Sequence, residues 1–333
     1  AKPCARIRHH YGIPKPSNMN APAPFRAEQI SSNALKVIER LQSEGFEAYL
    51  VGGGVRDLLL GTQPKDFDVS TDATPEQVRR LFRNSRIIGR RFRIVHVLFG
   101  REVIEVTTFR GQHPPQEEDT ANKHSRVSES GRLLRDNVFG SIEEDALRRD
   151  FTVNALYYRP SDNTILDFCE GLQDLEARRL TLIGDPDTRY REDPVRMLRA
   201  VRFCAKLGFE MSPEVVSPIA ELAPLLHDIP PARMFDEALK LFMSGAAVAT
   251  YHQLQAHQLF GFLFPASQRI LARQEPVDTG FVEAVLRNTD VRIGQGKPVT
   301  PAFLYGAFLW PAVRQQSEAL VKQGEPAIQA RQQ

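Results

Sequence analysis

The sequence is poor in cysteine and in long apolar runs. Its 333 residues contain three cysteines, Cys4, Cys169 and Cys204, which are widely separated and form no C-x-x-C pair. That spacing excludes a disulfide framework and a cysteine zinc site, and it favours a reducing compartment. No apolar stretch approaches the roughly 20 residues that a membrane helix needs, and the basic N-terminal segment lacks the apolar part of a secretory signal. We therefore expect a cytoplasmic protein that does not enter a membrane.

An excess of one charge is also absent. The chain has 43 lysines and arginines against 41 aspartates and glutamates, which leaves a net charge of +2. So small an excess does not by itself indicate a nucleic-acid partner. Charged residues make up 25% and hydrophobic residues 42% of the chain, proportions that are typical of globular proteins with one or more packed cores. The positions of the arginines are therefore more informative than their number.

Changes in composition divide the chain into four parts. Residues 1–25 contain five prolines and little apolar periodicity, so we expect a disordered arm. Residues 26–170 alternate short apolar strands with helical patterns, which predicts a head with a mixed sheet. Strand patterns then give way to helical ones, over a neck at 171–235 and a body at 236–333. The expected fold class is α+β, a mixed α and β head followed by an all-α neck and body.

Turn residues and apolar runs predict the individual elements of the head. Thr74 is a suitable N-cap, and Pro75 suits the first turn of a helix that ends at Phe82. Strands are expected at 48–51, 67–69, 94–99, 102–108, 155–158 and 165–167, helices from 31, 55 and 142, and a polar loop at 111–131.

Three consecutive glycines precede two closely spaced aspartates. Gly52, Gly53 and Gly54 stand at a strand-to-helix turn, where bare backbone lets phosphate approach the amide N–H groups. Asp66 and Asp68 lie two residues apart on a predicted strand, so their side chains should leave the same face, about 7 Å apart at the backbone. Carboxylates so placed can bridge two divalent cations about 4 Å apart for in-line phosphoryl transfer, and such oxygen ligands suit magnesium. A dinucleotide site is excluded, because no G-x-G-x-x-G follows the strand.

A third acid should come from a neighbouring strand. Glu105 lies between apolar residues, and burying it would be costly without a cation, unless it points outward from an edge strand. Asp150 is the other candidate. It follows Arg148 and Arg149, so it either forms a local salt bridge or holds a ribose hydroxyl while Arg149 contacts phosphate. The eight histidines have no ligand-like spacing, and His96 is expected to pack or hydrogen-bond rather than catalyse.

Arginines gather in two places. One cluster, within residues 83–93, includes Arg90, Arg91 and Arg93. The other recurs every three residues along a predicted helix at 194–207, whose remaining surface is mostly apolar and therefore buried. The arginines of the second cluster, Arg196, Arg199 and Arg202, should then face a cleft. Together with Asp193 they can present hydrogen-bond donors and acceptors to the edge of a base.

Three motifs in this order resemble the class II nucleotidyltransferases of the DNA polymerase β superfamily, which include bacterial poly(A) polymerases and CCA-adding enzymes. The motifs are Val51–Asp57 continuing to Asp66–Asp68, then Arg148–Thr152, then Arg191–Arg199. The resemblance covers about residues 31–235. The segment Ile87–Val97 is similar to the signature of the poly(A) polymerase branch, and its arginines Arg90, Arg91 and Arg93 are candidate RNA contacts.

The resemblance also implies roles for the candidate residues. These are metal binding by Asp66, Asp68 and Glu105, triphosphate contact by Gly53 and Arg56, phosphate and ribose recognition by Arg149 and Asp150, and a nucleotide-base pocket with Asp193, Arg196 and Arg199. The catalytic candidates are Asp66, Asp68, Glu105 and Asp150, the last contacting either ribose or metal.

The implied activity is template-independent addition of AMP from ATP to RNA 3′ ends, with two Mg²⁺ ions. The partners are then RNA 3′ ends and ATP; protein partners in RNA decay are not specified by the sequence. One alternative is a CCA-adding enzyme acting on transfer RNA. Another is a non-catalytic RNA-binding protein of the same fold, against which the intact Asp66 and Asp68 pair argues. Members of the branch usually extend into a basic C-terminal tail, and this chain stops at Gln333, so we expect a truncated RNA-binding body with reduced RNA affinity.

Overall fold

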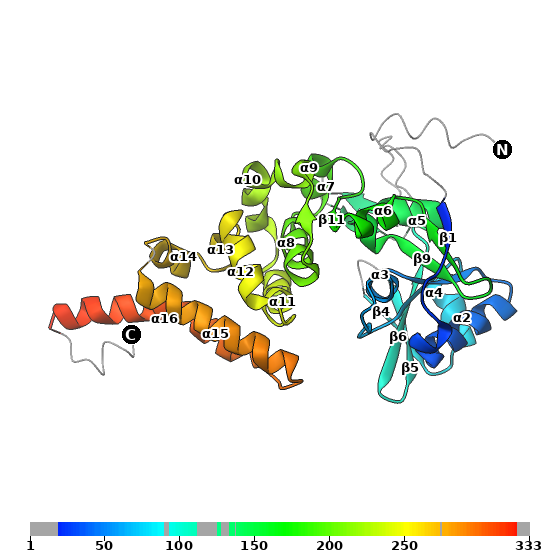
Figure 1. Ribbon diagram of the computed structural model, residues 1–333, viewed down its shortest axis with the longest axis horizontal. Coiled ribbons are helices and arrows are strands. Elements are labelled where there is room, and N and C mark those ends of the chain that lie inside the picture. Colours follow the sequence, from blue (N-terminus) through cyan, green and yellow to red (C-terminus); the bar gives the residue numbers. More distant parts are fainter. Residues whose placement is uncertain are drawn as a thin grey trace. The chain divides into compact units, whose positions relative to one another are not determined.

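The chain divides into two compact units, Ala1–Asp193 and Pro194–Gln333 (Figure 1). The computed structural model describes residues 19–89, 93–111, 125–127, 133–136, 138–273 and 275–324, and of residues 19, 125–127 and 133–136 only the backbone. The expected mixed head is found in the first unit and the expected helical part in the second.

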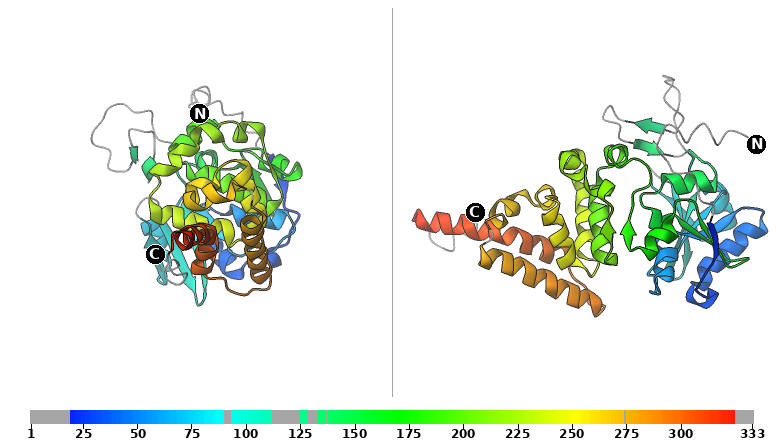
Figure 2. Two further views of the ribbon diagram at one scale, coloured as in Figure 1. Left: turned by 90° about the vertical axis from the view of Figure 1, so that its left-hand side faces the viewer. Right: turned by 45° about the horizontal axis from the view of Figure 1, so that its top comes forward.

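The first unit is built on a mixed eight-stranded sheet with the order β1-β10-β9-β2-β3-β6-β5-β4 (Figure 1). Its strands are β1 (Met19–Pro22), β2 (Ala48–Val51), β3 (Asp68–Thr71), β4 (Ser85–Ile88), β5 (Ile94–Phe99), β6 (Glu102–Thr108), β9 (Leu156–Arg159) and β10 (Thr164–Asp167). The neighbours β3 and β6 run parallel, and the other pairs are antiparallel. A separate hairpin of β7 (Ser125–Val127) and β8 (Leu133–Asp136) is drawn in the right-hand view of Figure 2.

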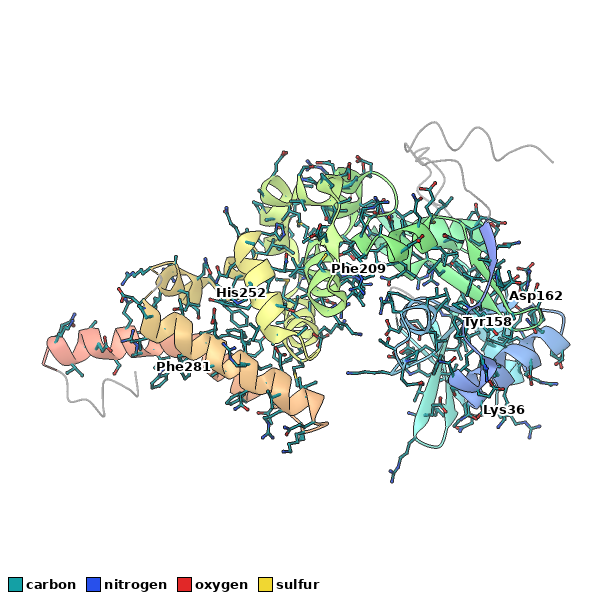
Figure 3. All side chains as sticks on the ribbon, in the orientation of Figure 1. Lys36, Tyr158, Asp162, Phe209, His252 and Phe281 are labelled. Carbon is teal, nitrogen blue, oxygen red and sulfur yellow. The ribbon has the colours of Figure 1, made fainter. Side chains whose placement is uncertain are left out.

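The first unit also contains helices, several of which pack on strands of the sheet. The helices are η1 (Ala27–Gln29), α2 (Ser32–Ser43), α3 (Gly53–Leu59), α4 (Pro75–Leu81), α5 (Ile142–Arg148), η2 (Thr152–Asn154), α6 (Gly171–Glu176) and α7 (Pro186–Glu192), with the short strand β11 (Arg179–Leu180) between the last two. Helix α2 packs against β2, β3 and β6. Lys36 on its outer side is exposed (Figure 3), and so is Glu39 of the same helix. The predicted start of α4 is confirmed by two hydrogen bonds. The Thr74 hydroxyl accepts from the backbone N–H of Gln77, and Oε1 of Gln77 accepts from the backbone N–H of Thr74.

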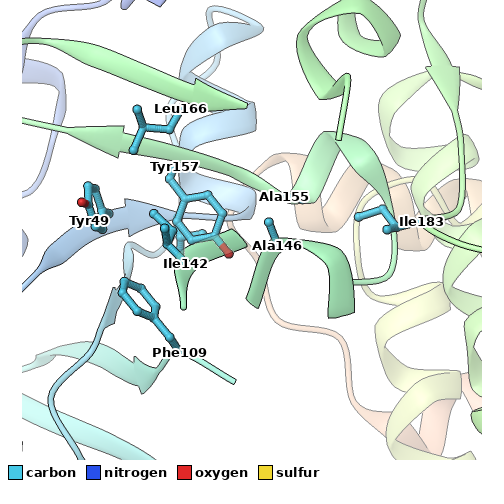
Figure 4. Packing of buried hydrophobic residues seen from close by; sticks show 9 residues of the cluster. Tyr49, Phe109, Ile142, Ala146, Ala155, Tyr157, Leu166 and Ile183 are labelled. Carbon is cyan, nitrogen blue, oxygen red and sulfur yellow. The ribbon is translucent and has the colours of Figure 1, made fainter. Parts of the chain in front are cut away.

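Buried residues of β2, β9 and β10 form a hydrophobic core with residues of α5. Its members are Tyr49, Val51, Phe109, Ile142, Ala146, Ala155, Tyr157, Leu166 and Ile183 (Figure 4). Because Ile142 and Ala146 of α5 are buried in this cluster, the residues that follow the helix, Arg149 and Asp150, are fixed relative to the sheet.

The prediction of a disordered arm over residues 1–25 is wrong for residues 19–25. Met19–Pro22 form β1, which pairs with β10, and the ring of Phe25 packs on that of Tyr158 with centroids 5.0 Å apart. A proline is tolerated here because β1 is an edge strand, where one side of the backbone needs no partner. Residues 1–18 lie outside the described part of the chain.

The predicted end of the head at residue 170 is also wrong, because the first unit continues to Asp193. Two long-range contacts hold the later residues in the unit. The Thr152 hydroxyl donates to Asp174 on α6 at 2.6 Å, and the backbone N–H of Ile183 donates to the carbonyl of Asp150 at 2.9 Å. The neck predicted at 171–235 is therefore divided between the two units.

The second unit is helical, as expected. Its helices are α8 (Val195–Leu207), α9 (Pro213–Val216), α10 (Ile219–Leu222), η3 (Ala223–Asp228), α11 (Pro231–Phe242), α12 (Ala247–Ala256), α13 (Phe260–Leu263), α14 (Pro265–Leu271), α15 (Pro276–Gly294) and α16 (Pro301–Lys322), with the two-residue strand β12 (Glu210–Met211) after α8. Phe242, Phe260, Phe264 and Phe308 pack together in its core. Among the described helices, none combines the length and the apolar character needed to cross a bilayer.

Candidate active site

The glycine turn has a backbone conformation that only glycine adopts easily. After the buried strand β2, Gly52 takes φ 75° and ψ −134°, and its N–H donates to the carbonyl of Leu156 at 3.2 Å. A Cβ on Gly52 would lie 3.5 Å from Nη1 of Arg149. Because Gly52 has no side chain, the Arg149 guanidinium lies close to the backbone of the turn. A phosphate could contact both the guanidinium and the backbone there.

The loop that leads to the aspartates packs directly on the same turn. A Cβ on Gly54 would lie 3.3 Å from the backbone carbonyl oxygen of Asp66 and 3.4 Å from the ring of Phe67. This close approach brings the acidic segment against α3, so the predicted proximity of the glycines and the aspartates is found in the structure.

Two of the three predicted acids, Asp68 and Glu105, are neighbours on central strands of the sheet, and the charge of the third, Asp66, also acts on Asp68. Asp68 opens β3 and is the parallel neighbour of Glu105 on β6. Burial, and then the charges of Glu105 and Asp66, raise the pKa of the Asp68 carboxyl to about 7, while Arg149 opposes the shift. Burial is the largest cause of this shift, and the two neighbouring carboxylates add to it more negative charge than Arg149 offsets.

One detail of the predicted acid pair is wrong. Asp66 does not lie on the strand, because β3 begins only at Asp68, and Asp66 is an exposed residue of the preceding loop. The contact of Gly54 with the Asp66 backbone explains the difference, since the loop bends over α3 before it enters the sheet. The spacing of Asp66 and Asp68 therefore predicted correctly that the two acids lie close together, but wrongly that both lie on one strand.

Glu105 is partly engaged elsewhere. Its Oε1 lies 3.2 Å from Nε2 of His96, the residue opposite it on β5, and 45% of the side chain is exposed. The hydrogen-bonding role expected for His96 is confirmed. Since β6 lies between β3 and β5, the alternative that Glu105 stands on an edge strand is wrong. Within the described residues, no three His, Cys, Asp or Glu side chains already converge as a ligand group for a metal ion.

Arg56 belongs to a buried network behind the glycine turn. The residue is 3% exposed, and its guanidinium donates to Asp57 Oδ1 through Nε at 2.8 Å and through Nη2 at 2.6 Å. Its Nη1 donates to Oδ1 of Asn154 at 2.6 Å, and Nδ2 of Asn154 donates to Oδ1 of Asp150 at 3.2 Å. Two predicted nucleotide contacts, Arg56 and Asp150, are thus connected through one side-chain amide that the sequence analysis did not identify.

Arg149 is held by a second network. Its Nε donates to the Tyr157 hydroxyl and its Nη2 to Asp145 Oδ2, both at 3.0 Å, and the Tyr157 hydroxyl donates to the same carboxylate at 2.6 Å. Burial favours a higher pKa for Asp145, but Arg149, the hydrogen bond from Tyr157 and that from the Arg110 N–H hold the pKa below its ordinary value. Asp145 precedes Arg149 by four residues, which is a helical pairing that the sequence could have revealed.

Another arginine fixes the same segment from α7. Nη2 of Arg189 donates to the backbone carbonyls of Arg148 at 2.8 Å and of Arg149 at 2.7 Å, and its Nη1 pairs with Glu192 at 2.8 Å. A cation at the carbonyl end of a helix is favourable. Arg148 itself turns away and donates to the carbonyl of Gly111. No spacing pattern predicts the contacts of Arg189, because they join residues about forty positions apart.

The remaining predicted residues lie apart from these networks. Arg93 pairs with Glu76 at 2.5 Å, and Arg90 and Arg91 lie outside the described residues. Asp193 is the cap residue after α7 in the first unit.

On α8 of the second unit, Arg196, Arg199 and Arg202 are half-buried, and the guanidinium carbons of Arg199 and Arg202 lie 5.4 Å and 4.9 Å from the centre of the Phe203 ring. The RNA contacts and the base pocket stay predictions.

Comparison with known proteins gives consistent matches. Residues 48–181 match the family described as the Poly A polymerase head domain, and residues 208–271 match the one described as the probable RNA and SrmB-binding site of polymerase A. The chain is 54% identical over 297 residues to Poly(A) polymerase I of Salmonella typhimurium, covering 89% of this chain and 63% of that protein. It is 57% identical over 285 residues to the enzyme of Escherichia coli O157:H7, covering 85% and 61%.

A solved structure shares the fold. The CCA-adding enzyme of Bacillus stearothermophilus in complex with CTP aligns with a TM-score of 0.59 and 27% identity, over 90% of this chain and 80% of that one. The chain spans about three fifths of the length of the two polymerases compared above. The matched head contains the glycine turn, the acids and both arginine networks. Residues 48–181 of this chain therefore form a head domain of the poly(A) polymerase family, a branch of the nucleotidyltransferases to which the CCA-adding enzymes are close relatives.

Proposed function

We propose that this protein adds AMP from ATP to the 3′ ends of RNA without a template. The observation that supports this most strongly is the accumulation of carboxylates at Asp68. The Asp66 backbone just before it lies against Gly54, and Gly52 of the same turn faces Arg149. The carboxylates at Asp68 suit a metal cation, and the Arg149 guanidinium suits a phosphate. Together they suit a triphosphate with bound metal ions. The identity of 54% to a poly(A) polymerase over most of this chain favours ATP as the nucleotide.

The residues fit divalent cations. Burial of the Asp68 carboxyl, and then the charges of Glu105 and Asp66, raise its pKa to about 7, and a bound cation would offset both effects. Asp66 and Asp68 would hold the ions, and Glu105 would join them on leaving His96. When bound there, two magnesium ions would neutralise the triphosphate and lower the pKa of the RNA 3′ hydroxyl.

The protein's own groups would bind and orient the substrates. The backbone at Gly53, with Arg56 behind it, would hold the triphosphate, and Arg149 would meet a phosphate across Gly52. Asp150 would accept a hydrogen bond from the ribose. In the reaction the RNA 3′ oxygen forms a bond to the α-phosphorus of ATP, the bond from that phosphorus to the bridging oxygen of pyrophosphate breaks, and the hydroxyl proton is released.

We further propose that the second unit binds RNA and contributes to base selection. Residues 208–271 match a family described as a probable RNA-binding site. Asp193, Arg196 and Arg199 would recognise the base, and the cluster with Arg90, Arg91 and Arg93 would contact RNA. The free thiols Cys169 and Cys204 are compatible with the cytoplasm as the site of reaction.

The test is nucleotide incorporation into RNA, with each nucleotide supplied singly in the presence of Mg²⁺. We expect ATP to be incorporated by the wild type and incorporation to be abolished in Asp66→Ala and Asp68→Ala. The matched control is Asp162→Asn, which removes an exposed carboxylate paired with Arg159 at 2.7 Å. Incorporation that survives in either alanine variant would refute the proposed site.

Two other outcomes would replace the proposal. Incorporation of CTP into transfer RNA that lacks its 3′ end would identify a CCA-adding enzyme. Tight RNA binding without Mg²⁺-dependent incorporation of any nucleotide would identify a non-catalytic RNA-binding protein.

A further inference from the structure

One buried amide joins two groups of opposite charge. Asn154, the last residue of η2, is 7% exposed. Its Oδ1 accepts from Nη1 of Arg56 at 2.6 Å, and its Nδ2 donates to Oδ1 of Asp150 at 3.2 Å. The charges on its neighbours fix the orientation of the amide, because the oxygen must meet the guanidinium and the nitrogen must meet the carboxylate.

We propose that Asn154 is a positioning residue that makes the triphosphate and the ribose of an incoming nucleotide bind as one unit. The inference rests on the proposed function, in which Arg56 serves the triphosphate and Asp150 the ribose. Because both are hydrogen-bonded to the same amide, a displacement of one alters the bond that orients the other.

The two charged groups also have local contacts, which hold each of them within its own segment. Asp57 holds Arg56 through Nε and Nη2, and the backbone N–H of Phe151 donates to the same oxygen of Asp150 at 2.8 Å. These contacts are local in sequence, one residue away in each case. The bond of Asn154 to Arg56 crosses 98 residues of sequence and therefore joins the α3 segment to the Asp150 segment.

The chemistry of the side chain predicts which replacements separate its two functions. Aspartate keeps an acceptor for Arg56 but places a carboxylate against Asp150, so it should preserve the triphosphate contact and disturb the ribose contact. Leucine, of similar size, offers neither bond and should disturb both. Loss of a buried hydrogen bond to a charged group typically corresponds to about a tenfold change in an equilibrium constant.

The matched control lies in the same 3₁₀ turn. Thr152 is buried and donates to Asp174 at 2.6 Å, so Thr152→Val removes a buried hydrogen bond of η2 without altering the bonds to Arg56 or Asp150. If η2 acted only as a structural support, Thr152→Val and Asn154→Leu would both lower the melting temperature. Each would also reduce the affinities for ATP, dATP and AMP by the same factor.

The experiment measures the affinities of the 333-residue chain for ATP, dATP and AMP by titration calorimetry in the presence of Mg²⁺. The ATP/dATP affinity ratio reports the ribose contact and the ATP/AMP ratio reports the triphosphate contact. We expect Asn154→Leu to lower both ratios, by roughly tenfold if one charged hydrogen bond is lost at each end. Asn154→Asp should lower mainly the first, and Thr152→Val should keep both ratios of the wild type.

The outcomes distinguish this inference from the function on which it rests. A wild type that does not bind ATP refutes the proposed function. A wild type that prefers ATP to dATP and AMP, with both preferences unchanged in Asn154→Leu and Asn154→Asp, refutes the role of Asn154 alone. Should Asn154→Leu fail to fold, the ratios of Asn154→Asp decide.

Discussion

Replacing Asp68 by asparagine should stabilise the first unit above neutral pH while abolishing activity. The carboxyl of Asp68 is largely buried, and burial followed by the charges of Glu105 and Asp66 raises its pKa from 3.8 to about 7. A carboxyl whose pKa is raised on folding binds its proton more tightly in the folded state. Its ionisation therefore lowers the free energy of unfolding, from about pH 4 upward, and the loss is complete above about pH 7.

The size of the effect follows from the shift. One pKa unit corresponds to about 1.4 kcal/mol, so a shift of this size sets an upper limit of about 4 kcal/mol. Solvent access to the exposed Asp66 and the partly exposed Glu105 reduces it, and we expect Asp68→Asn to gain about 1–3 kcal/mol at pH 8. For a unit of this length, each kcal/mol raises the melting temperature by about 2–4 °C.

The assay is calorimetric unfolding in a chelator at pH 4 and pH 8. The stabilisation should be present at pH 8 and absent at pH 4, and Mg²⁺ at pH 8 should raise the melting temperature of the wild type more than that of the variant. The control is Glu39→Gln, which removes one charge from the exposed side of α2. The reasoning is refuted if Asp68→Asn is no more stable than the wild type at pH 8, or if its gain is the same at both pH values.

The other predictions concern the groups around the glycine turn. Asp145→Asn leaves the Arg149 guanidinium without its buried counter-charge, and we expect a loss of about 3 kcal/mol in unfolding free energy together with weaker ATP binding; unchanged denaturant unfolding would contradict the network. Gly52→Ala puts a side chain at φ 75° and 3.5 Å from Arg149 Nη1. It should cost about 1–3 kcal/mol and weaken ATP binding, whereas Gly61→Ala, at another positive φ but with open space around the new Cβ, should leave ATP affinity at the wild-type value in the same titration.

Local patterns in the sequence predicted those features that depend on near neighbours. The Thr74 cap depends only on residues three positions apart, and three consecutive glycines are enough to predict the turn at 52–54. Strand β1 was missed because its pairing partner, β10, lies far along the chain and because its own four residues, one of them a proline, are too few to establish a period. The same holds for Asn154, whose importance comes from a bond to Arg56 across 98 residues. Periodicity cannot reveal such contacts, because they depend on the completed fold.

The end of the head was misjudged for a related reason. Helical patterns after residue 170 suggested a separate neck, but a helical pattern does not state which core a helix joins. Here hydrogen bonds join Asp174 to the Thr152 hydroxyl and the Ile183 N–H to the Asp150 carbonyl, and these bonds hold both segments in the first unit. Asp66 lies two residues before the start of β3 and not on the strand, since the loop bends over Gly54 through a tertiary contact.

The parallel pairing of β3 with β6 has a consequence for how this site tolerates change. Asp68 and Glu105 face each other through main-chain register, whereas the chain between them makes a long detour through α4, β4 and β5. Residues added at the tip of the detour, between β5 and β6 at Gly100, would lengthen a ribbon without shifting either acid. A reporter peptide could therefore be carried there by an otherwise working enzyme.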